Sequence, residues 1–399
     1  MIKRQYKNIL VVFGTRPEAI KMAPVIHELH KYRGIGVINV SVSQHVEMLR
    51  HVLNVFDIKV EHNLRTMSRN QTLFSISVKA LEGFSRLLSR IKPDIILVQG
   101  DTTSAFMGAL SAYYHKIPVA HIEAGLRTNV KYSPFPEEIN RRLIGVIADF
   151  HFAPTKVAYN NLVKENVRED NIFVTGNTVI DALFETTNKG FDLRQISNNV
   201  LVRQIAEIDF KKKIVLITAH RRENFGKPFK DICQAVKVLA MNNNNIEIIY
   251  PVHLNSNVYK PAHKILGNIT NIHLIRPLEY DIFVHLMRRS YLILTDSGGV
   301  QEEAPSLGKP VLVLRNVTER PEAVTAGVVK LVGTDKDKII REAQKLIDSR
   351  SAYAKMASSL NPYGDGKAAS RIVKCLLGLP FEEFGVNLRQ SQTRGKRRF

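Results

Sequence analysis

The chain has 399 residues, 44% of them hydrophobic, which is enough for two ordinary domains with their own cores. It lacks the run of roughly 20 apolar residues that a membrane span needs, and the apolar stretch 9–13 is too short for a signal peptide. The formal net charge of +20 allows an anionic small substrate, a nucleic acid or an anionic membrane as a partner. We expect a cytoplasmic protein.

The basic residues are mostly scattered beside acidic ones, as on solvated helix faces. Their one cluster is the end of the chain, 386–399, where no acid follows Glu383, and we expect a disordered basic tail there. No nucleic-acid motif and no aromatic-interleaved basic stretch is present. A basic nucleic-acid-binding or surface-binding protein is therefore the weaker hypothesis. Cys233 and Cys375 lie in apolar helical patterns, which favours buried free thiols.

Short apolar runs alternate with helical patterns along the chain, which predicts parallel sheets covered by helices on both faces. The predicted strands are 8–13, 37–42, 94–98, 118–122, 150–153, 171–174, 213–218, 246–250, 272–275, 291–294, 310–314 and 328–331. Gly176-Asn177 is the best boundary between two such halves. We expect doubly wound Rossmann-like domains at 1–176 and 177–366 that face a central cleft, with helices from about 367–385 completing the first.

The stretch 291–323 has the pattern of a nucleotide site. A buried strand is followed by Ser297-Gly298-Gly299 and a helix from Val300, so amide groups and the positive helix end gather where a phosphate would bind. Glu303 can hold a vicinal diol, and Arg320 begins the next helix as a cation. An ordinary strand–turn–helix connection is the alternative, and the Glu303 and Arg320 positions favour the site.

The first helix starts with the same four letters, RPEA, as the helix after Arg320. Arg16 therefore stands in a second cation-bearing turn, and Lys21 is a further candidate cation. Coincidence is the alternative explanation for a repeat of four letters.

Polar clusters follow the buried strands, where ligands bind in doubly wound sheets. Asp101 and Glu123 each end a strand, with a glycine directly before Asp101 and two residues after Glu123, which favours proton transfer over helix capping. Glu137 lies at a helix start, where acids are also common for electrostatic reasons. His220 ends a strand of the second half beside two arginines, and His253 is the second histidine candidate, equally compatible with a capping or packing role.

No metal site is predicted, because no short His/Asp spacing supports one. The chain has no G-x-G-x-x-G and no Walker sequence, so neither a nicotinamide cofactor nor ATP is indicated.

The combined motifs resemble the non-hydrolysing UDP-N-acetylglucosamine 2-epimerases over nearly the whole chain except the tail. The motifs are GTRPEAIKMAP, QGDTTSA, HIEAGLRT, SPFPEEINR, VTGNTVIDAL, TAHRRENFG, PVHLN, LTDSGGVQEEAPSLGKPVL and TERPEAVTAG. The resemblance implies a two-domain GT-B fold, a homodimer, no cofactor, and interconversion of UDP-N-acetylglucosamine and UDP-N-acetylmannosamine for surface polysaccharide synthesis. It implies removal of the C2 proton with expulsion of UDP, through a glycal intermediate.

Position by position, the resemblance makes the catalytic set Asp101, Glu123, Glu137 and His220. It makes the UDP contacts Arg16, Lys21, Ser297, Gly298, Gly299, Glu303 and Arg320. Some members bind a second UDP-N-acetylglucosamine as an activator, and the positions that match this pattern are Gln44, Gln71, Arg221 and His253. Glu47 and Asn70 depart from the activator pattern, and Leu278 stands where many members have glutamine.

Two other enzyme classes fit the same nucleotide-sugar site. A hydrolysing epimerase would release free N-acetylmannosamine and UDP, and a GT-B glycosyltransferase would need an acceptor.

Overall fold

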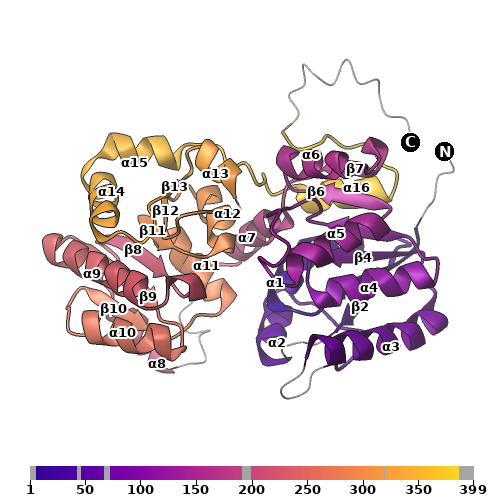
Figure 1. The fold of residues 1–399 in the computed structure, drawn as a ribbon, viewed down its shortest axis with the longest axis horizontal. Helices are drawn as coiled ribbons and strands as arrows, with labels where there is room; N and C mark the ends of the chain where they lie inside the picture. Colours follow the sequence, from indigo (N-terminus) through magenta and orange to yellow (C-terminus); the bar gives the residue numbers. More distant parts are fainter. Residues whose placement is uncertain (1–5, 43–45, 67–71, 191–198, 319, 386–399) are drawn as a thin grey trace. The chain divides into compact units, whose positions relative to one another are not determined.

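The computed structural model describes residues 6–42, 46–66, 72–190, 199–318 and 320–385. They form two compact units, one from residues up to Ala182 together with those from Tyr363 onward, and the other from Leu183–Pro362 (Figure 1). Each unit is built on its own parallel sheet with helices on both faces, so the predicted class of two doubly wound α/β domains is confirmed. Gln44, Gln71 and the basic tail lie outside the described residues.

The first unit contains a seven-stranded sheet in the order β3-β2-β1-β4-β5-β6-β7. Its strands are β1 (Asn8–Phe13), β2 (Gly36–Ser41), β3 (His62–Asn63), β4 (Ile95–Gln99), β5 (Val119–Ile122), β6 (Phe150–Ala153) and β7 (Ile172–Val174). Its helices are α1 (Arg16–His30), α2 (Val46–Val55), α3 (Leu73–Ile91), α4 (Thr103–Tyr114), α5 (Glu137–Ile147), α6 (Lys156–Lys164), the start of α7 (Thr178–Asn188) and α16 (Ala368–Leu376), with the 3₁₀ helix η1 (Glu169–Asn171). The two-residue strand β3 is polar, so the sequence has no apolar run there from which a strand could be predicted.

Helices α3, α4 and α5 pack side by side on one face of this sheet, and α1 lies on the other with α2 and α16 against it. The carboxylate of Asp181 in α7 accepts hydrogen bonds from the backbone N–H groups of Ala368 and Ala369, at 3.2 and 2.9 Å. Because these amides have no partner within α16, the buried aspartate caps that helix and holds the returning chain in the first unit.

The second unit contains a six-stranded sheet in the order β10-β9-β8-β11-β12-β13. Its strands are β8 (Lys213–Thr218), β9 (Ile246–Pro251), β10 (Ile272–Ile275), β11 (Leu292–Thr295), β12 (Val311–Val313) and β13 (Val329–Leu331). Its helices are α8 (Asn199–Ala206), α9 (Lys227–Asn242), α10 (Ser256–Leu266), α11 (Tyr280–Arg289), α12 (Gly298–Ser306), α13 (Pro321–Thr325), α14 (Lys336–Asp348) and α15 (Arg350–Ala357), with η3 (Arg222–Asn224). The main core lies between the sheet and α9, α10 and α14.

Each sheet reverses its winding once, between β1 and β4 in the first unit and between β8 and β11 in the second. At such a switch point the connections leave in opposite directions, and a crevice opens beyond the carboxyl ends of the two strands. The turns that follow these four strands begin at Gly14, Gly100, Ala219 and Asp296. These turns belong to the polar clusters that follow the buried strands in the sequence.

None of the helices in the described part of the chain combines the length and apolar character needed to cross a bilayer.

Two histidines are buried side by side in the first sheet. His121 on β5 is in register with His151 on β6, and both side chains are about 1% exposed. Burial lowers the pKa of His121 to about 3 and that of His151 to about 4. The Nε2 atom of His121 lies 2.7 Å from the carbonyl oxygen of Gly100. Both rings are therefore neutral in the folded protein at ordinary pH, and His121 supports the turn that follows β4.

We predict that the first unit loses stability as the pH falls from about 6.5 toward 4, because the unfolded chain binds protons at both histidines and the folded chain does not. Each histidine adds a slope of up to about 1.4 kcal/mol per pH unit in this window. His121→Gln should remove the contribution of roughly one proton from the pH dependence of the free energy of unfolding, measured by denaturant unfolding at pH 7 and pH 5. The exposed control His30→Gln should keep the wild-type slope. A wild-type slope in His121→Gln would show that His121 takes up its proton in the folded state.

Candidate active site

Two acids follow neighbouring strands at the carboxyl edge of the first sheet. Asp101 comes after β4 and Gly100, and Glu123 comes directly after β5. Glu123 has a backbone φ of +64°, a left-handed conformation that is uncommon for residues other than glycine. Such conformations cost free energy and collect at functional sites. The unusual backbone at Glu123 supports its choice as a functional acid.

The carboxylate of Glu123 is held by two donors. Lys21, from α1, forms an ion pair with its Oε2 atom, and the side-chain amide of Gln99 donates to the same oxygen at 2.7 Å. The Glu123 side chain is only 7% exposed, so the two donors compensate for its removal from water. The sequence assigned Lys21 to a nucleotide, and in the structure its ammonium group lies at the acids of the first unit. Gln99 was not singled out, although it belongs to the QGD motif.

Asp101 is placed by two residues of α5. Arg141 donates to its Oδ2 atom, and the side-chain amide of Asn140 donates to its backbone carbonyl at 3.0 Å. Burial raises the pKa of Asp101, while the positive charge of Arg141 lowers it and the nearby Glu123 raises it. A carboxyl group with a raised pKa takes up a proton more readily than a free carboxyl group, which suits a general acid or base.

The turn that carries Asp101 is tied to the turn after β1 by Glu18. This buried carboxylate accepts hydrogen bonds from the backbone N–H groups of Gly14 and Thr15, at 3.0 and 2.7 Å, and from the Thr102 hydroxyl at 2.6 Å. Burial raises the pKa of Glu18, and these hydrogen bonds oppose the shift. Glu18 thus fixes both sides of the switch point. The T-x-x-E spacing of Thr15 and Glu18 signals a capping box, but not this second contact.

The two adjacent acids at the start of α5 have different environments. Glu138 is buried and accepts hydrogen bonds from the backbone N–H groups of Thr128 and Asn129 and from Arg141 and Arg142. Burial opposes its charged form, but these donors outweigh that cost, and the pKa of Glu138 is lowered. Glu137 is partly exposed at the first position of the helix. Glu138 therefore holds the preceding loop, and Glu137 is the one able to meet a substrate.

In the second unit, α12 begins at Gly298, two residues earlier than the sequence pattern indicated, with Ser297 as its N-cap. The Ser297 N–H donates to the Thr295 hydroxyl at 2.9 Å, and Gly298 and Gly299 are the first two residues of the helix. The amides of a first turn have no acceptor within their own helix. The turn after β11 therefore presents backbone donors and a positive helix end to an anion.

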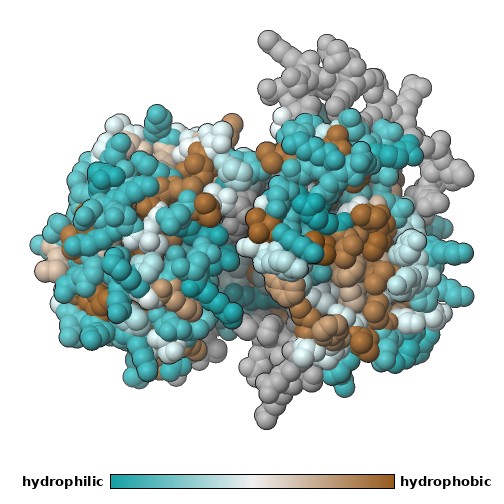
Figure 2. Space-filling model, in the orientation of Figure 1, coloured by the Kyte–Doolittle hydropathy of each residue, from teal (hydrophilic) through white to brown (hydrophobic). Residues whose placement is uncertain are grey.

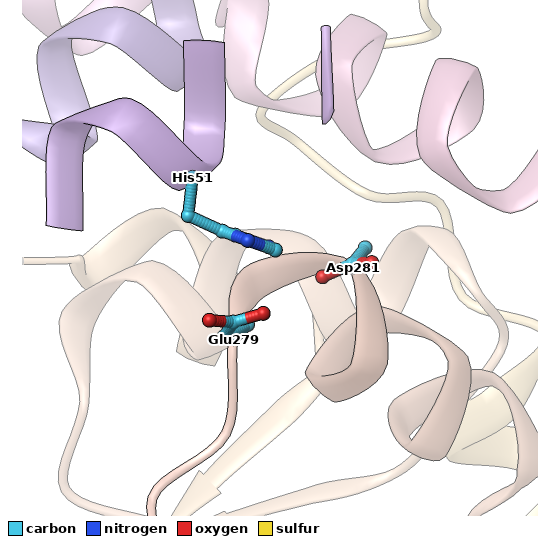
Figure 3. Close-up of side chains that lie close together, drawn as sticks. All are labelled: His51, Glu279 and Asp281. Carbon is cyan, nitrogen blue, oxygen red and sulfur yellow. The ribbon is translucent and has the colours of Figure 1, made fainter. Parts of the chain in front are cut away.

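Glu303 lies one turn into α12 with its carboxylate close to the helix start. Its Oε1 atom accepts a hydrogen bond from the Tyr280 hydroxyl at 2.8 Å, and a Cβ atom at Gly299 would stand 3.6 Å from its Oε2. Burial and the neighbouring Glu303 charge raise the pKa of Tyr280 well above its usual range, so this phenol stays a donor. Tyr280 opens α11, which also carries Glu279 and Asp281 at its start (Figure 3).

The cations singled out by the sequence differ in how they are held. Arg320 is the N-cap of α13, and its Nε atom donates to Oε1 of Glu302, a carboxylate that is 2% exposed, at 2.7 Å. That ion pair fixes the guanidinium group. Arg16 is the exposed first residue of α1 in the other unit.

His220 follows β8 in the second unit and stacks on His253, with ring centroids 5.5 Å apart and planes 13° apart. Burial lowers the pKa of His220, the Asp296 carboxylate raises it, and His253 and Arg221 lower it further. Arg221 donates from Nε to the backbone carbonyl of Asp296 at 3.3 Å. The structure thus brings His220, Arg221 and His253 together, and the two glutamines matched to the same activator pattern lie outside the described residues.

The family model described as UDP-N-acetylglucosamine 2-epimerase matches residues 27–377 of this chain. A UDP-N-acetylglucosamine 2-epimerase of Campylobacter jejuni is 52% identical over 376 residues, which cover 93% of this chain and 97% of the relative. One of Bacillus subtilis is 51% identical over 370 residues, which cover 93% of this chain and 95% of the relative.

Solved structures agree with these sequence matches. The UDP-N-acetylglucosamine 2-epimerase of Neisseria meningitidis, solved with bound UDP-N-acetylglucosamine, is 50% identical with a TM-score of 0.84, and the match covers 93% of this chain and 99% of that one. A Listeria monocytogenes protein described as a putative member of the same class is 45% identical with a TM-score of 0.85, covering 93% and 96% of the two chains.

We predict that Arg141→Met destabilises the first unit by about 3 kcal/mol, because it removes the ion pair of the partly buried Asp101 and one of the two arginine partners of the buried Glu138. The pKa of Asp101 should rise in the same variant, since Arg141 stabilises its charged form. The neighbouring control Arg142→Met should cost less than about 1 kcal/mol, as its side chain is 37% exposed. Denaturant unfolding and carboxyl-carbon NMR titration measure the two effects. Equal losses for both arginines would contradict the assigned role of Arg141.

Proposed function

The chain belongs to the UDP-N-acetylglucosamine 2-epimerase family, which makes it an isomerase acting on that nucleotide sugar, and we propose the route by which it works. A carboxylate removes the C2 proton, the electron pair forms the C1=C2 double bond, and the C1–O bond breaks so that UDP leaves with its oxygen. A proton then adds to C2 from the other face and UDP re-adds at C1. The intermediate is 2-acetamidoglucal and the product is UDP-N-acetylmannosamine.

The observation that carries this proposal is the pair of acids at the ends of β4 and β5. Two proton transfers on opposite faces of C2 need two groups, and Asp101 and Glu123 are held on neighbouring strands by different donors. Asp101 has a raised pKa, while Lys21 and Gln99 hold the carboxylate of Glu123. The two carboxyl groups therefore have different hydrogen-bond partners, as two groups with different roles in proton transfer would need. We propose Glu137 as the third acid of the set.

We assign the nucleotide to the second unit. The first amides of α12, with Ser297 at the N-cap, would hold the diphosphate, Glu303 the ribose diol, and Arg320 a phosphate oxygen. We keep Arg16 as a further proposed UDP contact. Diphosphate leaves more easily when donors and cations stabilise the charge that develops on it. UDP-N-acetylmannosamine is an activated amino sugar, which suits it as a donor for enzymes that build surface polysaccharides.

The function is tested by incubating the protein with UDP-N-acetylglucosamine alone and identifying the products. The proposal expects UDP-N-acetylmannosamine in a reversible mixture, without an acceptor. Free N-acetylmannosamine with stoichiometric UDP would instead identify a hydrolysing enzyme. Turnover only after addition of a sugar acceptor would identify a glycosyltransferase. A sigmoidal dependence of the rate on substrate would support an activator site at Arg221 and His253.

We also propose that two copies of the chain associate through the α3–α4–α5 layer of the first unit. Hydrophobic side chains gather on this face (Figure 2), and the most exposed are Phe74, Val78, Tyr113, Tyr114 and Val146. Phe74 is 85% exposed, and a groove of about 420 Å³ between α3 and α4, lined in part by Leu81 and Tyr114, lies on the same layer. An apolar projection and an apolar groove on one surface suit a two-fold interface, in which each copy offers both.

We predict that replacing the acids lowers turnover without loosening the nucleotide. Asp101→Asn and Glu123→Gln keep size and some hydrogen bonding but remove the proton carrier, so kcat should fall by about 10²–10⁴-fold. Glu137→Gln should behave in the same way, and Asp170→Asn, which is 63% exposed on η1, should remain active. Steady-state kinetics and UDP titration separate the effects. Weak UDP binding with a near-normal kcat would assign these acids to positioning instead.

We predict that Glu303→Gln and Arg320→Ala weaken UDP binding, each by roughly 10-fold or more, because each removes a charge-assisted hydrogen bond. Glu303→Gln should also reduce the preference for UDP over 2′-deoxy-UDP, since the lost oxygen is the proposed diol acceptor. Calorimetry on the two nucleotides measures both, with the exposed Asp337→Asn on α14 as the control. Wild-type affinity in both folded variants would move the nucleotide site elsewhere.

We predict that Val78→Asp, which places a charge on the exposed α3 surface, halves the mass seen by sedimentation velocity. Leu360→Asp is the matched control, because Leu360 is 89% exposed in the second unit. A wild-type protein that sediments as one chain, or a Val78→Asp variant that keeps its partner, would exclude this interface.

A further inference from the structure

Asp296 is a fully buried carboxylate at the end of β11 in the second unit. Its Oδ2 atom accepts hydrogen bonds from the backbone N–H groups of His220 and Arg221, both at 2.8 Å, and from the side-chain amide of Asn224 at 3.2 Å. This oxygen therefore braces the turn that follows β8. The role is structural and concerns one of the two carboxylate oxygens.

The other oxygen has no such partner. Oδ1 of Asp296 is buried without a hydrogen bond in the described structure. A buried carboxylate oxygen without a donor is costly, so an unsatisfied one in a folded protein calls for an explanation. The Nδ1 atom of His220 lies 3.8 Å away, too far for a hydrogen bond but within reach of a small rotation of the ring. The His220 side chain is 42% exposed, so part of it is open to solvent while Asp296 is fully buried.

We propose that Asp296 is the positioning residue of His220: Oδ1 accepts the Nδ1–H proton and leaves Nε2 as the nitrogen that exchanges a proton or hydrogen bond with the substrate. The proposal rests on the proposed function in one respect, namely that His220 interacts with the substrate during the reaction. Asp296 itself touches no substrate.

The groups around His220 favour this arrangement. His253, which stacks on it from the end of β9, accepts the backbone N–H of Asn255 at its own Nδ1 at 3.1 Å, so that nitrogen carries no proton. Arg221 is the neighbouring cation and holds the Asp296 carbonyl. Asp296 opposes the effects of burial, His253 and Arg221 on His220, because a carboxylate stabilises an imidazolium ring. A carboxylate partner fixes both the tautomer and the orientation of an imidazole.

The tautomer of His220 is the direct test. Full-length protein labelled with ¹⁵N-histidine should show His220 protonated at Nδ1 in long-range ¹H–¹⁵N spectra, with His220→Gln used to assign the signal. In Asp296→Asn the amide oxygen can still accept the two backbone N–H groups, but its NH₂ group would face Nδ1. The expected tautomer is then the reverse, with the proton on Nε2. The pKa of His220 should fall by about one unit or more, since the carboxylate that favours its charged form is gone.

Asp296→Asn should also lower kcat on the order of 10²–10⁴-fold, with a smaller change in KM. Asn224→Ala is the matched control, because it removes a donor from Oδ2 and leaves Oδ1 untouched. It should keep the wild-type tautomer and His220 pKa. A role of Asp296 in bracing the turn alone would give the two variants the same tautomer.

A wild-type His220 that carries its proton on Nε2 overturns the proposal, even if Asp296→Asn does not fold. An unchanged tautomer and pH profile in folded Asp296→Asn overturns it as well. The spectra need no turnover, so they stand apart from the product analysis that tests the proposed function. A protein without epimerase activity would end the proposed function and leave the tautomer result intact.

Discussion

The candidate site depends on one constraint. A carboxylate that is removed from water needs hydrogen-bond donors, and the carboxylate then holds in place the backbone that carries these donors. Glu18 accepts from amides of the turn after β1 and from the Thr102 hydroxyl of the neighbouring turn. Asp296 accepts from amides of the turn after β8, and Glu138 from amides of the loop before α5. Glu18 and Asp296 thus hold turns at the two switch points, and Glu138 holds a loop that follows β5. Asp101 and Glu123 use side-chain donors instead, so their carboxylates are placed without giving up all their lone pairs to the backbone.

The two units carry different kinds of side chains and backbone groups at their strand ends. The first unit concentrates acids, whose proton affinity is set by burial and by paired cations such as Arg141. The second unit offers a helix start, the carboxylate of Glu303 held by Tyr280, and Arg320 held by Glu302. The proposed elimination of UDP needs both kinds of group, because it combines removal of a proton with departure of a charged diphosphate. Because each unit has its own parallel sheet, each kind of group can lie at the carboxyl ends of a separate set of strands.

Much of this was predictable from the sequence, for a physical reason. Alternating apolar runs and helical patterns determine a doubly wound sheet, and its strand ends collect polar turns, so Glu123 and Ser297 could be chosen without a structure. The burial of a side chain and its hydrogen-bond partners could not be predicted in that way. Lys21 reads as a free cation on a helix, and only the fold pairs it with Glu123. Asp296 reads as a turn residue, since nothing in a local pattern shows that one oxygen is braced and the other is not. Local patterns also misplace ends, as the early start of α12 at Gly298 shows.

The central claim is that C2 of the sugar loses its proton and regains one from the solvent pool during epimerisation. Product formed from UDP-N-acetylglucosamine in D₂O and analysed by NMR and mass spectrometry tests it most directly. The account predicts UDP-N-acetylmannosamine with deuterium at C2, together with deuterium in the recovered substrate as the reaction reverses. Epimerised product that keeps its original C2 hydrogen would contradict the account.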